Sequence, residues 1–97
     1  MIVKNKRIMI IGGTGALGTA LTDRWCDNND VLVFSRNEHK QEDMKRQYPN
    51  VLYRIGDVKD KGSILRTMYE FKPDIIVNTA AMKTVWVAQD NPYETIL

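Results

Sequence analysis

Three glycines are spaced so that the turn they form could hold a phosphate group. Gly12, Gly15 and Gly18 follow a short apolar segment at residues 8–11 and open a segment with helical spacing of its apolar residues. In such a turn the first glycine permits a tight bend, the second lets backbone approach a pyrophosphate, and the third allows close helix–sheet packing. The amides and dipole of the following helix favour the phosphate charge. We therefore expect the phosphates of a dinucleotide to bind at Gly12, Thr14, Gly15, Ala16, Leu17 and Gly18.

The same glycines could instead form a turn that only packs neighbouring elements and binds no ligand. A nucleoside-triphosphate loop of the Walker A type fits less well, because it requires Gly-Lys-Ser/Thr at the start of the helix. The sequence has Leu17-Gly18-Thr19 there, without a lysine. A strand pattern before the turn and a helix pattern after it favour the dinucleotide interpretation.

The residues after the second apolar segment, 31–34, bear on which dinucleotide is bound. An NAD enzyme commonly has an acidic residue there, which binds the ribose 2′-hydroxyl, whereas this sequence has Ser35 and Arg36. A hydroxyl and a guanidinium can donate to a 2′-phosphate, and the guanidinium can stack on adenine. Lys40 could reach the same phosphate from the next helix. We expect NADP in preference to NAD; the alternative is that Arg36 and Lys40 are ordinary surface charges.

Two further pairs of residues follow the third and fourth apolar segments. The Asp57 side chain and the Val58 amide could meet the adenine edge, although a turn-forming aspartate explains Asp57 equally well. Ala80 and Ala81 are small enough to let the backbone approach a cofactor ribose, but small residues there also fit simple packing. These four residues complete the cofactor site predicted from the residues themselves.

Apolar strand segments alternate with helical segments along the chain, and this order predicts how the site is assembled. Strands are expected at 8–11, 31–34, 51–55 and 75–77, with helices after the glycine turn, at 38–47, and between a capping Asp60 and Pro73. Right-handed crossovers then give a parallel sheet in the order 3-2-1-4. The predicted fold is α/β, a single Rossmann-type domain over residues 1–97 with flanking helices.

Composition narrows the function classes. The chain has 97 residues, of which 43% are hydrophobic and 27% charged, as in an ordinary single globular domain. A lone histidine, His39, and a lone cysteine, Cys26, argue against a zinc site or a Ser-His-Asp triad, and we expect an unreactive thiol. The net charge of +2 is too small for a nucleic-acid surface. Without a long apolar run or a signal peptide, we expect a cytoplasmic protein that does not contact membranes.

The end of the chain carries a helix-start signal. Asn91, Pro92 and Glu94 suit the N-cap, first and third positions of a helix, yet the sequence stops at Leu97. We therefore expect a truncated form of a longer ancestral protein. With four strands, the apolar segment at 75–77 would form an exposed sheet edge, which predicts a homo-oligomer.

The motifs together resemble the extended short-chain dehydrogenase/reductase family. The stretches that carry the resemblance are Gly12–Gly18, Ser35-Arg36, Gly56-Asp57-Val58 and Thr79-Ala80-Ala81. Within it, the sequence is most similar to the polysaccharide-biosynthesis branch of UDP-N-acetylglucosamine 4,6-dehydratases, through Ser35–Lys40, Ala80–Val85 and Asn91–Glu94. The match runs through nearly all the chain but only about the first third of such an enzyme. Thr84, Trp86 and Gln89 replace the usual His, Pro and Glu, which leaves the sugar open.

The resemblance implies an NADP-dependent dehydratase or epimerase acting on a UDP-sugar. The resemblance to the 4,6-dehydratases implies transient oxidation of the sugar at C4, elimination of water across C5–C6 and return of the hydride, with a Tyr-x-x-x-Lys pair. Tyr48, Tyr53 and Tyr69 lack a lysine at that spacing, and Tyr93 is too near the end. We assign no catalytic residue and no metal ligand, and expect the chain alone to be inactive. The resemblance implies that Lys83 approaches substrate or cofactor; a solvated lysine in a polar loop is the alternative. The alternative function is a non-catalytic NADP(H)-binding or self-associating module.

Overall fold

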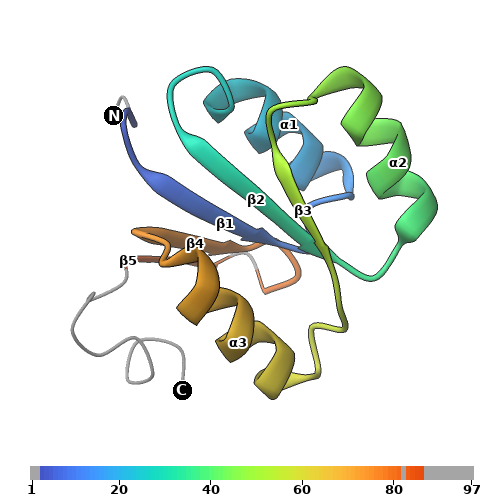
Figure 1. Ribbon diagram of the computed structural model, residues 1–97, viewed down its shortest axis with the longest axis vertical. Coiled ribbons are helices and arrows are strands. Elements are labelled where there is room, and N and C mark those ends of the chain that lie inside the picture. Colours follow the sequence, from blue (N-terminus) through green and yellow to red (C-terminus); the bar gives the residue numbers. More distant parts are fainter. Residues whose placement is uncertain (1–2, 82, 87–97) are drawn as a thin grey trace.

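The structure, a computed structural model, describes residues 3–81 and 83–86, which form a sheet with helices on both faces (Figure 1). The elements are β1 (Arg7–Ile11), α1 (Ala16–Trp25), β2 (Asp30–Ser35), α2 (Glu38–Gln47), β3 (Leu52–Ile55), α3 (Lys61–Phe71), β4 (Ile75–Asn78) and β5 (Lys83–Trp86). The strand order is β3-β2-β1-β4-β5. The first four strands in this order are parallel, and β5 is antiparallel to β4. The predicted parallel order 3-2-1-4 is confirmed.

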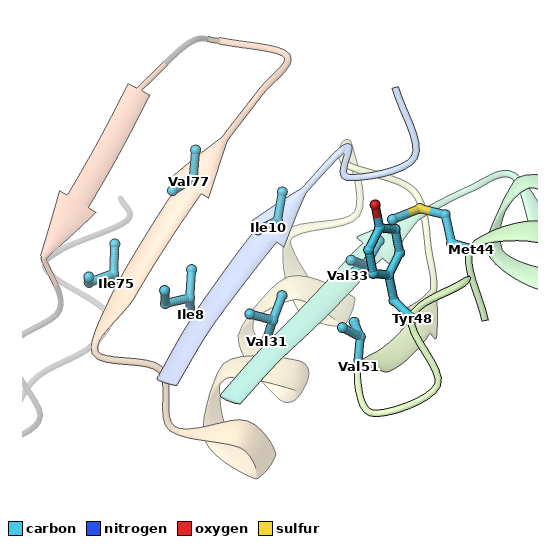
Figure 2. Close-up of a cluster of buried hydrophobic side chains, with 9 residues drawn as sticks. All are labelled: Ile8, Ile10, Val31, Val33, Met44, Tyr48, Val51, Ile75 and Val77. Carbon is cyan, nitrogen blue, oxygen red and sulfur yellow. The ribbon is translucent and has the colours of Figure 1, made fainter. Parts of the chain in front are cut away.

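Each face of the sheet has its own apolar core. On the face covered by α1 and α2, alternate residues of β1, β2 and β4 pack with side chains from the end of α2, as Figure 2 shows; the buried members are Ile8, Ile10, Val31, Val33, Met44, Tyr48, Val51, Ile75 and Val77. The other face packs against α3; its buried members are Met9, Ile11, Leu32, Phe34, Ile64, Met68, Phe71 and Ile76. Central strands covered on both faces must be apolar at every position, which explains their unbroken hydrophobic runs.

The strand register brings the ends of the parallel strands to one edge of the sheet. Ile11 pairs with Phe34 on one side and with Asn78 on the other, and Ser35 pairs with Ile55. The loops that follow β1, β2, β3 and β4 therefore meet at this edge. In open α/β sheets this carboxyl edge is where ligands bind.

Side-chain caps start two of the helices, α2 and α3. Asn37 caps α2 by accepting a hydrogen bond from the Lys40 amide at 3.0 Å. Asp60 caps α3 by accepting one from the Ser63 amide at 3.1 Å, as expected from the sequence. The helix α3 ends at Phe71, and its C-cap Lys72 has a left-handed backbone with φ 55, directly before Pro73.

The prediction of an exposed apolar edge at residues 75–77 is wrong. Strand β5 lies antiparallel along β4, with Ile76 opposite Val85, and Ile75, Ile76 and Val77 are 2–5% exposed. The chain turns back after β4 and supplies the missing neighbour itself, so the edge offers no reason for self-association. The predicted helix start at Asn91 lies outside the described residues. None of the helices in the described ranges is long and apolar enough to span a membrane.

Candidate functional site

The glycine turn between β1 and α1 is built so tightly that two of its glycines cannot carry a side chain. Gly12 has φ +76, and a Cβ atom on it would lie 2.6 Å from Thr79 Oγ1. A Cβ on Gly18 would lie 2.3 Å from Gly13 Cα. Gly12 therefore makes the bend, and Gly18 lets α1 begin directly against the turn. The close contact of Gly18 is with the turn, whereas Gly13 packs onto the sheet at Val33.

Gly15 differs from these glycines because the space beside it is open. A Cβ on it would meet nothing nearer than the Gly12 carbonyl oxygen at 3.8 Å, and its backbone is extended, with φ −75 and ψ 178. Gly15 is the N-cap of α1, but no side chain caps this helix and its first turn has no acidic residue. The first amides of a helix have no partner within it. In contrast to α2 and α3, the start of α1 is left to an external acceptor, and an anion fits there.

The end of β4 holds the glycine turn in place. Thr79 Oγ1 lies 2.8 Å from the Ile11 carbonyl oxygen and 3.0 Å from that of Gly12, and donates its hydroxyl hydrogen between them. The Thr79 amide also donates to Ile11 at 3.0 Å. Sequence reasoning did not give Thr79 this positioning role. Its signal was a hydroxyl residue directly after an apolar strand, in the motif that carried the family resemblance.

Ala80 and Ala81 lie exposed in the turn after β4. Their amides donate to Asn78 Oδ1 at 3.1 and 3.2 Å, so the asparagine side chain shapes this turn. The Ala80 nitrogen would lie 3.8 Å from a Cβ on Gly12, which places the turn beside the glycines. The two alanines are thus next to the expected cofactor path, and a contact with the ribose stays a prediction.

An open cleft of about 650 Å³ adjoins the glycine turn on the side of β2 and β3. It is lined by Gly12, Ser35, Arg36, Asn37, Glu38, Asp57, Val58 and Lys59. Five of these residues were predicted from the sequence as cofactor ligands; Asn37, Glu38 and Lys59 were not. Lys40 is exposed on α2 outside this lining. Two apolar residues are exposed nearby. Leu17, beside the glycine turn, is 42% exposed, and Val58, in the cleft, is 39% exposed.

Ser35 is placed at the cleft but is almost completely buried, with 3% exposure. Its Oγ accepts a hydrogen bond from Gln41 Nε2 at 2.8 Å, and the same nitrogen lies 3.0 Å from the Arg54 carbonyl oxygen. Gln41 thereby ties α2 to β2 and β3. Sequence reasoning missed Gln41, although it shares a helical stripe with the buried Met44 and Tyr48.

Arg36 and Asp57 form an ion pair in the lining of the cleft. Arg36 Nη1 lies 3.6 Å from Asp57 Oδ2, and their side chains are 81% and 42% exposed. The other carboxylate oxygen of Asp57 accepts a hydrogen bond from the Lys59 amide at 2.9 Å. The turn-forming role of Asp57, one of its two predicted roles, is therefore present. Gly56 precedes it because a Cβ there would lie 2.3 Å from the Phe34 ring.

The alternative interpretation of Lys83, a lysine in a polar loop, is wrong about the loop, because Lys83 lies in a strand. It is the first residue of β5, opposite Asn78 in the antiparallel pair with β4. Its place beside the end of β4 follows from a strand that the sequence interpretation did not include. A contact between Lys83 and the cofactor or substrate stays a prediction.

Away from the cleft, three titratable groups have raised pKa values. Burial raises the pKa of Tyr53 to about 12, and burial together with the carboxylate of Asp23 raises the pKa of Tyr48. Burial and the nearby Asp27 and Asp23 raise the pKa of the Cys26 thiol, which agrees with the expected unreactive cysteine. Within the described ranges, no group of three His, Cys, Asp or Glu side chains could hold a metal ion.

The profile of a family described as polysaccharide biosynthesis protein matches residues 8–97. The chain belongs to this family. It is 38% identical over 96 residues to a UDP-N-acetylglucosamine 4,6-dehydratase (inverting) from Campylobacter jejuni, covering 94% of this chain and 28% of that protein. It is also 35% identical over 100 residues to a UDP-glucose 4-epimerase from Rickettsia bellii, covering 95% and 29%. The resemblance noted in the sequence is confirmed, and the chain spans just over a quarter of these relatives' length.

Solved structures agree with this assignment of the fold. The Bordetella bronchiseptica enzyme WbmG in complex with NAD superposes with a TM-score of 0.69 at 27% identity, covering 78% of this chain and 25% of that one. A second structure of WbmG contains NAD and UDP. The part of each relative that matches is a Rossmann-type domain.

Proposed function

We propose that residues 1–97 form the dinucleotide-binding Rossmann domain of a nucleotide-sugar dehydratase or epimerase of polysaccharide biosynthesis. The observation that carries this is the start of α1, which no side chain caps, at a glycine turn on the carboxyl edge of a parallel sheet. Helix starts of this kind bind phosphate through backbone amides and the helix dipole. The names of the relatives and the NAD in WbmG support the same function.

In this proposal the chain binds and orients the cofactor. The amides from Ala16 to Gly18 donate to the pyrophosphate, and the cleft that Arg36 and Asp57 help to line receives the adenosine half. The open space at Gly15 is what lets the pyrophosphate approach the helix. A bound nicotinamide would supply reversible hydride transfer with the sugar. We also propose that the complete enzyme acts on a UDP-sugar and that the protein is cytoplasmic.

We further propose that NADP binds more tightly than NAD. Arg36 directly follows β2 and its guanidinium is 81% exposed at the cleft, where it can donate to a 2′-phosphate. Ser35, which is buried and bonded to Gln41, contributes by fixing the backbone from which Arg36 projects.

Calorimetric titration of the purified chain with NADPH and with NADH tests both the dinucleotide site and the preference for NADP. We expect both to bind below millimolar concentration, with NADPH several-fold tighter. The variant Arg36→Gln should weaken NADPH binding to the level of NADH and leave NADH binding unchanged. If neither nucleotide binds to the folded chain, the dinucleotide site is refuted. Tighter binding of NADH would refute the role of Arg36.

For the 97 residues alone we propose binding without turnover, because none of the tyrosines is followed by lysine at the family's spacing. Incubation with UDP-N-acetylglucosamine and NADP⁺, followed by analysis of the nucleotide sugar, tests this. We expect the sugar to be recovered unchanged. A dehydrated product would show that other side chains of this chain supply the acid–base chemistry.

A further inference from the structure

The cleft beside the glycine turn contains charges of both signs. Arg36 and Lys59 line it together with Glu38 and Asp57. Of these, Arg36 and Asp57 form an ion pair, with 3.6 Å between Nη1 and Oδ2. The guanidinium that would receive a 2′-phosphate therefore already has an anionic partner.

The carboxylate of this pair is held in place more firmly than the guanidinium. Asp57 Oδ1 accepts the hydrogen bond from the Lys59 amide at 2.9 Å, and the Asp57 carbonyl oxygen accepts one from the Asp60 amide at 2.9 Å. The preceding residue, Gly56, donates its amide hydrogen to the Ser35 carbonyl oxygen at 3.0 Å. Arg36 has a long side chain that is 81% exposed. When an anion enters, Arg36 can move toward it, whereas Asp57 stays where it is.

Building on the proposed dinucleotide site, we propose that Asp57 sets the preference between NADP and NAD by competing with the 2′-phosphate for Arg36. A 2′-phosphate carries nearly two negative charges and must share the Arg36 guanidinium with the Asp57 carboxylate or draw it away from that carboxylate. NAD has a neutral hydroxyl at the same position and meets no such competition. Asp57 thus weakens the advantage that Arg36 gives to NADP.

The size of this effect follows from the exposure of the pair. Exposed ion pairs and like charges at this range in water contribute up to about 1 kcal/mol, which alters a binding constant by up to about five-fold, and salt screens them. Removing the carboxylate should therefore tighten NADP⁺ by about two- to five-fold at low salt and change NAD⁺ by less than about two-fold. The gain should shrink as sodium chloride is added.

The variant Asp57→Asn tests the proposal, because it has the same size and keeps an oxygen for the Lys59 amide. Asp57→Ser, which also keeps a turn-forming oxygen, provides a second neutral variant. Asp60→Asn is the matched control: it removes the same charge three residues away, outside the cleft lining, and asparagine is an equally good N-cap. Dissociation constants for NADP⁺ and NAD⁺ are measured by calorimetry for all four proteins, and again with Arg36→Gln in the Asp57→Asn background.

We expect the ratio of the NAD⁺ to the NADP⁺ dissociation constant to rise in both Asp57 variants, to stay unchanged in Asp60→Asn, and to rise less when Arg36 is also replaced. Equal changes for both nucleotides would overturn the proposal, because Asp57 would then act on their shared adenosine part. Weaker NADP⁺ binding would also overturn it, since Asp57 would then position Arg36 for the phosphate. If the folded wild-type chain binds neither nucleotide, the proposed dinucleotide site is refuted. If the wild type binds both nucleotides but the ratio does not rise in the Asp57 variants, only the role of Asp57 is refuted.

Discussion

At Gly15, fold stability and cofactor binding should respond in opposite directions to one substitution. Gly15 is the N-cap of α1, and the space beside it is open, because a Cβ there would lie 3.8 Å from the Gly12 carbonyl oxygen. Its extended backbone suits any residue. In Gly15→Asp the carboxylate can accept hydrogen bonds from the first amides of α1, which are the groups proposed to hold the pyrophosphate.

The expected stability gain can be built from general magnitudes. Aspartate is a better N-cap than glycine by a few tenths of a kcal/mol. A negative charge at the helix start adds about 0.3–1 kcal/mol, and the loss of glycine flexibility in the unfolded chain adds about 0.4–1 kcal/mol. We therefore expect the free energy of unfolding to rise by about 1–2 kcal/mol, and for a domain of this size each kcal/mol raises Tm by about 4–8 °C.

Binding should fall, because the pyrophosphate loses its amide partners and meets a fixed negative charge. A hydrogen bond to a charged group contributes about 1.5–3 kcal/mol, so losing one or two weakens binding at least about ten-fold. Thermal unfolding and NADPH titration of the same preparation measure both effects. Gly15→Asn, which caps without charge, separates occupation of the amides from repulsion. Wild-type affinity in Gly15→Asp, or a clear loss of stability, would refute the proposed geometry of this site.

Three further predictions concern the frame around the site. Gly18→Ala should lower the free energy of unfolding by about 1–3 kcal/mol, because its Cβ would lie 2.3 Å from Gly13 Cα; a wild-type midpoint in urea would contradict this. Gln41→Met, of similar volume, should cost about 1–3 kcal/mol in the same assay through its lost buried hydrogen bonds, and an unchanged midpoint would deny them. Because burial raises the pKa of Tyr53 from 10.0 to about 12, its contribution to stability is complete below pH 10 and is lost as pH rises to about 12. Urea unfolding across this pH range should show a smaller decline in Tyr53→Phe than in the wild type, and equal declines would count against the raised pKa.

The sheet order and the glycine turn could be predicted because local rules determine them. A strand buried on both faces must be apolar throughout, as Ile8–Ile11 is, and crossovers in parallel sheets are right-handed. Gly12 and Gly18 were likewise predictable, since a positive φ or a close approach admits no side chain. For these features, pattern and sterics leave few alternatives.

Strand β5 could not be predicted in the same way. Its four residues, Lys83–Trp86, form a strand by pairing antiparallel with β4, so the contact depends on how β4 sits in the finished sheet. Short strands carry little signal of their own, and tertiary context decides them. The sequence argument for self-association lost its basis at this point, because it assumed that nothing in the chain covered β4; self-association itself stays a prediction.

Polar partners far apart in sequence were also beyond prediction. Arg36 and Asp57 are predicted site residues, but their ion pair arises only because β2 and β3 end side by side. Gln41 sits in a helix whose other residues are mostly charged, and its burial comes from the carbonyl groups that the sheet presents to it. Charge patterns along one sequence do not reveal such contacts across elements.

The central claim is that a dinucleotide binds at the start of α1 and along the cleft to Asp57. Amide chemical shifts of the ¹⁵N-labelled chain, recorded by NMR during an NADPH titration, test it directly. We predict the largest shifts at Gly13–Gly18, Arg36 and Asp57, and small shifts at the opposite end of the sheet around Asn28. Saturable shifts confined to that opposite end, or no shifts at millimolar NADPH, would contradict the account.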